Sequence, residues 1–183
     1  MIYKKINLNG VYIIEPLIHF DKRGYFYERF KLKEFKKKIG RNNLNFIQEN
    51  FSYSKKNVLR GLHLQRKYAQ GKLVSVIKGK IFDVIVDLRK NSKTYGKWHA
   101  EVLTEKNKKM LWIPEGFAHG FLTISDSAEI IYKVNNDYKQ KDEYTLLWND
   151  PEINIPWPKK NKLKLSEKDA KGLTLKEIKK IIF

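Results

Sequence analysis

The chain has 183 residues, which is enough for a sizeable core, and we expect residues 1–183 to form one domain. Hydrophobic residues make up 42% and aromatic residues 13%, which favours a β-rich fold because aromatic side chains suit half-buried strands. The lack of cysteine excludes disulfides, cysteine-ligated zinc and thiol nucleophiles.

The sequence carries no recognisable membrane or export signal. No apolar run approaches the ~20 residues that span a bilayer, and the start MIYKKINLNG lacks the apolar stretch of a signal peptide. We therefore expect a cytoplasmic protein without a membrane partner.

The net charge of +18 raises the possibility of nucleic-acid binding. The lysines are scattered along the chain, however, and no recognition motif accompanies them. We expect no specific nucleic-acid partner, and a basic nucleic-acid-binding β-barrel remains a minor alternative.

The N-terminal 40 residues predict two strands and a helix. Apolar and polar residues mix in 10–18, Asp21 to Gly24 forms a turn, and residues 25–30 alternate, which predicts a pair of strands. Residues 31–39 are basic with apolar side chains at near-helical spacing, so we expect a short surface helix that ends at Gly40.

Residues 45–148 predict a series of short strands separated by turn signals, which is typical of a sandwich or closed barrel. Gly79 divides a predicted hairpin, and Pro114 with Gly116 breaks the chain before another strand. The predicted strands are NFIQENFSYS, LRGLHLQ, KLVSVIKG, IFDVIVDLR, WHAEVL, KMLWIP, GFAHGFLTI, AEIIYKV and TLLWN.

The tail from Asp150 onward contains three prolines, so we expect it to run irregularly before a helical end in 166–182. Ser166 followed by Asp169 resembles the capping box that begins many helices.

Candidate chemistry centres on His63, one of two histidines that lie within two residues of a glycine. Strand alternation places His63 with Gly61 and Gln65 on one face, opposite Arg60, Leu62 and Leu64, although a local bulge can bring Arg60 to the same cavity. If Lys72 and Asp83 also face the interior of a barrel, a histidine, a lysine and a carboxylate meet there. Such a cluster suits acid–base chemistry.

Other chemistries have little support in the sequence. Metal sites of small cupin-type barrels usually begin with His-x-His, whereas Gln65 follows His63 by two positions, so we expect no metal ligands. No Gly-x-Ser-x-Gly elbow and no phosphate-binding glycine loop is present. Proton transfer by His, Tyr and Lys remains.

Seven segments in fixed order resemble the dTDP-4-dehydrorhamnose 3,5-epimerases of rhamnose biosynthesis. They cover most of the chain: DKRGYFYERF, QENFSYSKKNVLRGLHLQ, QGKLVSVIKGKIFDVIVDLRKNSKTYGKW, LWIPEGFAHGF, EIIYKVNNDY, WNDPEINIPWP and LSEKDAKG. The resemblance implies a mainly β, cupin-like jelly-roll barrel with a few short peripheral helices. It also implies an isomerase that needs no cofactor, takes part in cell-surface carbohydrate biosynthesis, and acts as a homodimer whose N-terminal strands extend onto the partner.

The resemblance assigns roles residue by residue. His63 would be the base, Asp169 would hold and polarise its ring, Tyr132 would be the acid, and Lys72 would stabilise the enolate. The substrate, dTDP-4-dehydro-6-deoxy-D-glucose, would become dTDP-4-dehydro-L-rhamnose by inversion at carbons 3 and 5. Further residues would bind the nucleotide sugar: Arg23, Glu28, Gln48, Glu49, Asn50, Arg60, Lys72, His119, Tyr138, Glu143 and Lys168.

Two features depart from the family pattern: Leu64 follows His63 where an aromatic residue is more usual, and the chain is unusually basic. They leave the preferred nucleotide sugar open, as well as inversion at one carbon or at both. A non-catalytic sugar- or nucleotide-binding barrel is the alternative from another class.

Overall fold

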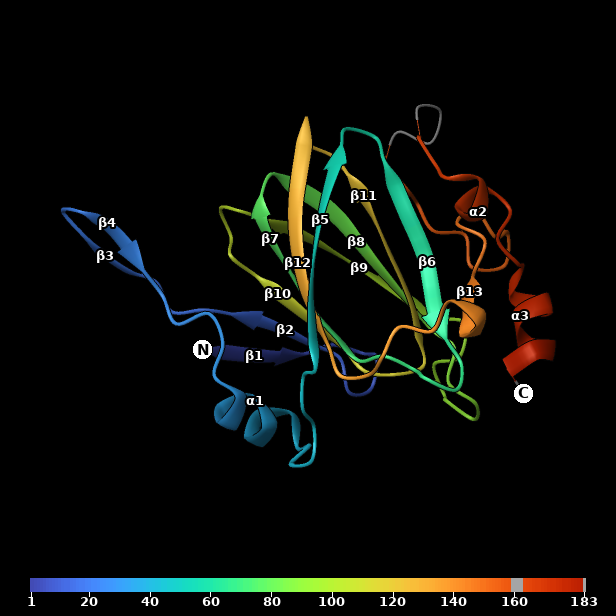
Figure 1. The fold of residues 1–183 in the computed structure, drawn as a ribbon, viewed down its shortest axis with the longest axis horizontal. Coiled ribbons are helices and arrows are strands. Elements are labelled where there is room, and N and C mark those ends of the chain that lie inside the picture. The colour runs from blue at the N-terminus through green and yellow to red at the C-terminus, as the bar shows by residue number, and fades with distance from the viewer. Residues whose placement is uncertain (159–162, 183) are drawn as a thin grey trace.

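The computed structural model describes residues 1–158 and 163–182, and most of their strands form two antiparallel sheets that face each other (Figure 1). One sheet has the order β1 (Ile2–Lys5), β2 (Tyr12–Glu15), β10 (Met110–Ile113), β7 (Lys72–Lys78), β12 (Ser127–Val134) and β5 (Gln48–Lys55). The other has the order β13 (Glu143–Thr145), β6 (Leu59–Gln65), β11 (Phe117–Thr123), β8 (Lys80–Asp87) and β9 (Trp98–Thr104).

Short helices lie at the periphery of the two sheets, as the sequence predicts. They are α1 (Leu32–Ile39), the 3₁₀ turn η1 (Gln140–Asp142), α2 (Glu167–Ala170) and α3 (Leu175–Ile182). Helix α1 ends at Gly40, whose φ of 71° and backbone N–H bond to the Lys36 carbonyl confirm the predicted glycine cap.

Strand alternation divides the buried side chains into three clusters. Val74 and Val76 of β7 pack against Ile81 and Ile85 of β8 in the space between the sheets. The outer face of the five-stranded sheet is covered by the C-terminal segment, including Trp157 and Ile178, and α1 covers part of the other outer face. Side chains of alternate residues therefore point into the barrel or away from it.

The predicted hairpin around Gly79 is wrong, although both of its strands are present. Strand β7 belongs to the six-stranded sheet and β8 to the five-stranded sheet, so they do not pair. Gly79 has a φ of 82°, and this left-handed conformation turns the chain from one sheet into the other.

The predicted N-terminal strand pair is only partly correct. Residues 12–15 pair with β1 and β10 instead of with residues 25–30. The turn at Asp21 to Gly24 does join two strands, β3 (His19–Asp21) and β4 (Gly24–Phe26), in a separate hairpin. Figure 1 shows this hairpin extending away from the body of the molecule, and we call residues 17–28 the N-terminal arm.

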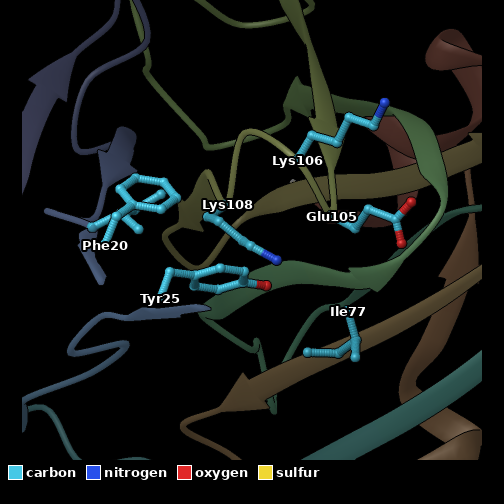
Figure 2. A pocket seen from close by; sticks show the side chains of 7 residues that line it. Phe20, Tyr25, Ile77, Glu105, Lys106 and Lys108 are labelled. Carbon is cyan, nitrogen blue, oxygen red and sulfur yellow. The ribbon is translucent and has the colours of Figure 1, made fainter. Parts of the chain in front are cut away.

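The arm approaches the body at an open pocket of about 450 Å³ (Figure 2). Phe20 and Tyr25 line it from the arm, and Ile77 with Lys108 lines it from the body. The ammonium of Lys108 lies 4.9 Å from the centre of the Tyr25 ring, a distance suited to a cation–π contact.

The other strands lie close to their predicted positions, except in the segment TLLWN. There the strand covers residues 143–145. The next residue, Leu146, is buried, exchanges backbone hydrogen bonds with Leu62 and forms an isolated parallel bridge with Leu173. Ser166 caps α2 by accepting a bond from the Asp169 N–H at 3.1 Å, which confirms the predicted helix start. Among the described residues, no helix is long and apolar enough to cross a membrane.

Candidate active site

His63 is hydrogen-bonded at one ring nitrogen, and a more distant carboxylate faces the other. It lies on β6 opposite the short helix α2, and its Nε2 is 2.6 Å from Asp169 Oδ1. Burial favours a higher pKa for Asp169, but the bonds to His63 and Ser166 outweigh it and lower this pKa. Because the carboxylate is ionised, Nε2 carries the proton and donates it, which leaves the Nδ1 lone pair free.

Glu143, at the start of β13, lies on the other side of the His63 ring. Its Oε1 is 3.8 Å from His63 Nδ1, and its Oε2 accepts a hydrogen bond from Tyr138 Oη at 2.8 Å and another from Lys168 Nζ. Burial raises the pKa of Glu143, whereas the bonds from Lys168 and Tyr138 lower it, and the net shift is downward. Glu143 is therefore a carboxylate with three partners.

A bulge brings Arg60 to the same face as His63. In the register between β6 and β11, His63 pairs with His119 and Arg60 with Phe121, so β6 takes three residue steps where β11 takes two. Strict alternation, which would place Arg60 on the face of Leu62 and Leu64, is therefore wrong at Arg60. The local bulge that the sequence allowed for is present.

Arg60 is held by the facing strand β5. Its Nε donates to Ser54 Oγ at 2.9 Å and its Nη2 donates to the Tyr53 carbonyl at 3.1 Å. The remaining guanidinium N–H groups can reach an anion.

Lys72 and Tyr132 occupy neighbouring strands of the six-stranded sheet and face its interior side. Burial lowers the pKa of Lys72 to about 8, against the opposing effect of the charges on Glu143 and Asp83. Burial raises the pKa of Tyr132, Arg60 lowers it and Glu143 raises it, and the net shift is upward. At neutral pH the lysine is thus mostly an ammonium and the tyrosine a phenol.

His119 and Asp83 form a second histidine–carboxylate pair between the sheets. His119 Nε2 lies 2.9 Å and 3.1 Å from the two oxygens of Asp83, and both side chains are buried. Lys72 and Asp83 therefore interact across the barrel interior as predicted, but the histidine bonded to Asp83 is His119, whereas the alternation on β6 pointed to His63.

His63, Asp169, Arg60 and Lys168 line an open pocket of about 440 Å³ between β6 and the C-terminal segment. Across residues 1–158 and 163–182, no cluster of three or more His, Cys, Asp or Glu side chains is arranged to hold a metal ion.

The family model for dTDP-4-dehydrorhamnose 3,5-epimerase matches residues 5–177. The chain belongs to this family. It is 52% identical to the epimerase of Shigella flexneri over 92% of each chain, and 48% identical to that of Methanothermobacter thermautotrophicus over 94% of each.

Solved structures of the family have the same cupin-like jelly-roll fold. The 3,5-epimerase of Legionella pneumophila, solved with dTDP-4-keto-L-rhamnose, has a TM-score of 0.94 at 42% identity and covers 99% of this chain and 96% of its own. A 3′-monoepimerase of Streptomyces bikiniensis, solved with dTDP-quinovose, has a TM-score of 0.90 at 28% identity, over 96% and 89%.

The predicted substrate-binding residues Gln48, Glu49 and Asn50 lie on two different faces of β5. Asn50 pairs with Tyr132 across β12 and so shares its face, and Gln48 donates to Asn50 Oδ1 at 2.6 Å. Glu49 points the other way and pairs with Lys133 at 2.6 Å. Glu49 is thus away from His63 in its own chain.

Within one chain, Arg23 and Glu28 also lie away from His63. Arg23 is at the tip of the N-terminal arm, bonded to Asp21, and Glu28 is at its base, paired with Lys31 at 3.3 Å. The structure therefore brings most, but not all, of the predicted residues together.

The sequence did not predict the roles of two residues that support the site, Asp83 and Ser54. Asp83 was expected inside the barrel from the alternation of DVIVD, but its partner His119 lies 36 residues away in the chain. Ser54, which holds Arg60, carries no distinctive sequence signal.

Proposed function

We propose that this chain inverts carbons 3 and 5 of dTDP-4-dehydro-6-deoxy-D-glucose to give dTDP-4-dehydro-L-rhamnose. Membership of the 3,5-epimerase family supports the reaction, and the Legionella relative was solved with the corresponding 4-keto-L-rhamnose nucleotide. The observation that carries the proposal is His63, which lines the pocket, has Nε2 bonded to Asp169, and has Nδ1 beyond hydrogen-bond distance of Glu143 at 3.8 Å.

His63 is the base in this mechanism. The hydrogens on carbons 3 and 5 are acidic because each carbon adjoins the carbon-4 ketone, and a histidine with an ordinary pKa near 6.5 suits their removal. The C–H electron pair moves into the enolate while the proton moves to Nδ1. The Asp169 carboxylate then stabilises the imidazolium that forms.

Lys72 supports the enolate. Its ammonium faces the interior between the sheets, where low dielectric strengthens its attraction for the negative oxygen at carbon 4. Because the ammonium is already in position before the reaction, its surroundings need little reorganisation when negative charge develops on the enolate oxygen.

Tyr132 returns a proton to the opposite face of the carbon. Its raised pKa keeps the phenol protonated until the enolate requires the proton. The phenolate must then regain a proton, and His63 must lose one, before the next inversion. One base and one acid on facing sheets are the minimum that inversion requires.

The remaining residues of the site bind the nucleotide sugar. Arg60 and Lys168 suit the diphosphate, and Tyr138, half exposed, offers an aromatic face to the base. The other binding residues are Gln48, Asn50, His119 and Glu143, of which Gln48 lies at the exposed start of β5.

The active form is a homodimer in which each N-terminal arm reaches the partner. The arm exposes Phe20 and Phe26, and the outer face of β5 exposes Phe51 and Tyr53, which indicates apolar surface in need of a partner. Extension of the arm away from its own body supports this arrangement (Figure 1). It would deliver Arg23 and Glu28 to the partner's site, where Glu49 of the outer face would also meet the other protomer.

The reaction is tested by incubating the wild-type chain with dTDP-4-dehydro-6-deoxy-D-glucose in deuterated water and following carbons 3 and 5 by NMR. We expect deuterium at both carbons and the L-rhamno product. Exchange at one carbon would favour a monoepimerase, and binding without exchange would favour a non-catalytic sugar-binding barrel.

A further inference from the structure

Glu143 contacts His63 and two residues that the proposed function assigns to nucleotide binding, Lys168 and Tyr138. One carboxylate oxygen, Oε2, holds Lys168 and Tyr138, the two groups that the proposed function assigns to the diphosphate and the base. The other oxygen, Oε1, faces His63 Nδ1 at 3.8 Å. The glutamate side chain is only 10% exposed, so water screens these interactions weakly.

Substrate and Glu143 compete for the same partners. Lys168 is half exposed and Tyr138 is 51% exposed, so both can turn toward a ligand. A diphosphate offers Lys168 more negative charge than a single carboxylate does, and a base that stacks on Tyr138 draws its ring toward the ligand. Binding would therefore weaken the contacts of Glu143 with Lys168 and Tyr138 that are present in the free protein.

We propose that Glu143 is a positioning residue that couples occupation of the nucleotide site to the basicity of His63, an inference that rests on the proposed function. In the free protein, Lys168 and Tyr138 offset part of the charge of Glu143 that acts on His63. With substrate bound, the released carboxylate acts on Nδ1 and favours the imidazolium. The base thus becomes stronger only when a C–H bond is in place.

Other charged groups near this pair do not replace Glu143. Asp169 binds the opposite nitrogen of His63 and contacts neither Lys168 nor Tyr138 among the described bonds. Lys72 and Tyr132 interact with Glu143 through space, and Arg60 lines the pocket beside His63. Among the described residues, Glu143 is the carboxylate that contacts both His63 and the binding residues Lys168 and Tyr138.

The coupling is measured by NMR titration of ¹⁵N-labelled histidine, with the His63 signal assigned by its loss in His63→Ala. Saturating dTDP should raise the pKa of His63 in the wild type by about one unit. The phosphates of dTDP cause part of this rise directly, and we attribute the rest to the Glu143 carboxylate. In Glu143→Gln, which lacks this carboxylate, the dTDP-induced rise in the pKa of His63 should therefore be smaller by about half a unit or more.

Lysine variants test the same coupling without ligand. Lys168→Met should raise the pKa of His63 in the free protein because Glu143 is no longer neutralised. Lys171→Met removes an equally charged, exposed lysine just after the same helix and should leave this pKa unchanged. In kinetics, Glu143→Gln should move the acidic limb of kcat to lower pH more than that of kcat/KM.

Equal dTDP-induced shifts in wild type and Glu143→Gln, or a fall in the free-protein pKa in Lys168→Met, would overturn the coupling. If the wild type bound dTDP-4-dehydro-6-deoxy-D-glucose without exchange at carbons 3 and 5, the proposed function would fail instead. The two failures are therefore distinguishable.

Discussion

Lys72 carries its ammonium into the space between the two sheets, where burial lowers its pKa to about 8. The unfolded chain has the ordinary value of 10.5. Between these values the unfolded state binds more protons, so stability rises with pH in this window, and below pH 8 the full cost of burying the charge remains. A residue proposed to stabilise the enolate thus destabilises the native fold at neutral pH.

We therefore predict opposite effects of Lys72→Met on stability and on turnover. At pH 7 the free energy of unfolding should increase by about 1–3 kcal/mol, while kcat falls by about 100-fold or more. Denaturant titrations at several pH values should show this gain shrinking from pH 8 to pH 10, as the native lysine loses its charge.

Lys78→Met, at the exposed end of the same strand, is the matched control and should change neither property much. A marked loss of stability in Lys72→Met at pH 7 would contradict this account of burial.

The histidine itself is visible in the sequence, because RGLHLQ places a polar ring inside an apolar strand with a nearby glycine. Its partner Asp169 lies 106 residues later and becomes visible only through resemblance to a family. Local patterns report which face a side chain takes, but not which distant side chain it meets.

At the scale of elements, the bulge between β6 and β11 depends on two glycines that touch. A Cβ on Gly61, whose φ is 106°, would lie 2.6 Å from the His119 carbonyl oxygen and 2.7 Å from Gly120 Cα. No side chain fits between these strands, and their close approach keeps Arg60 and His63 on one face.

Gly61→Ala should therefore lower the free energy of unfolding by about 3 kcal/mol or more and remove most of the activity. Gly40→Ala is the comparison, since Gly40 also has a positive φ but has no atom within 4 Å of an added Cβ. It should cost only about 1–2 kcal/mol. Similar losses in both variants would show that backbone conformation, and not the strand contact, dominates.

The element scale also shows where sequence patterns stop. The alternation in residues 72–87 predicts both strands. The sequence of a glycine turn, however, is the same whether the two strands that flank it pair with each other or enter different sheets. The closure of the barrel decides this, since β10 and β12 already occupy both edges of β7. The bulge at Gly61 is likewise a tertiary contact.

At the scale of the whole molecule, the proposed homodimer predicts that each site uses residues from two chains. His63→Ala removes the base from its own site, and Arg23→Ala removes an arm residue from the partner's site. A mixed dimer of the two variants would then contain one intact site.

Mixing these two impaired variants after dissociation and reassociation should restore about a quarter of the wild-type activity per chain, because half of the dimers are mixed. Activity and sedimentation of the mixture provide the measurement. No recovery in a mixture shown to contain mixed dimers would place Arg23 outside the partner's site.

The central claim is that His63 removes the sugar protons, and deuterium exchange tests it most directly. Wild type, His63→Ala and His99→Ala are incubated with dTDP-4-dehydro-6-deoxy-D-glucose in deuterated water, and exchange at carbons 3 and 5 is followed by NMR. We predict that His63→Ala loses exchange by about 10²–10⁴-fold while still binding dTDP, and that His99→Ala, on β9 outside the pocket, exchanges normally. Wild-type exchange rates in His63→Ala would contradict the account.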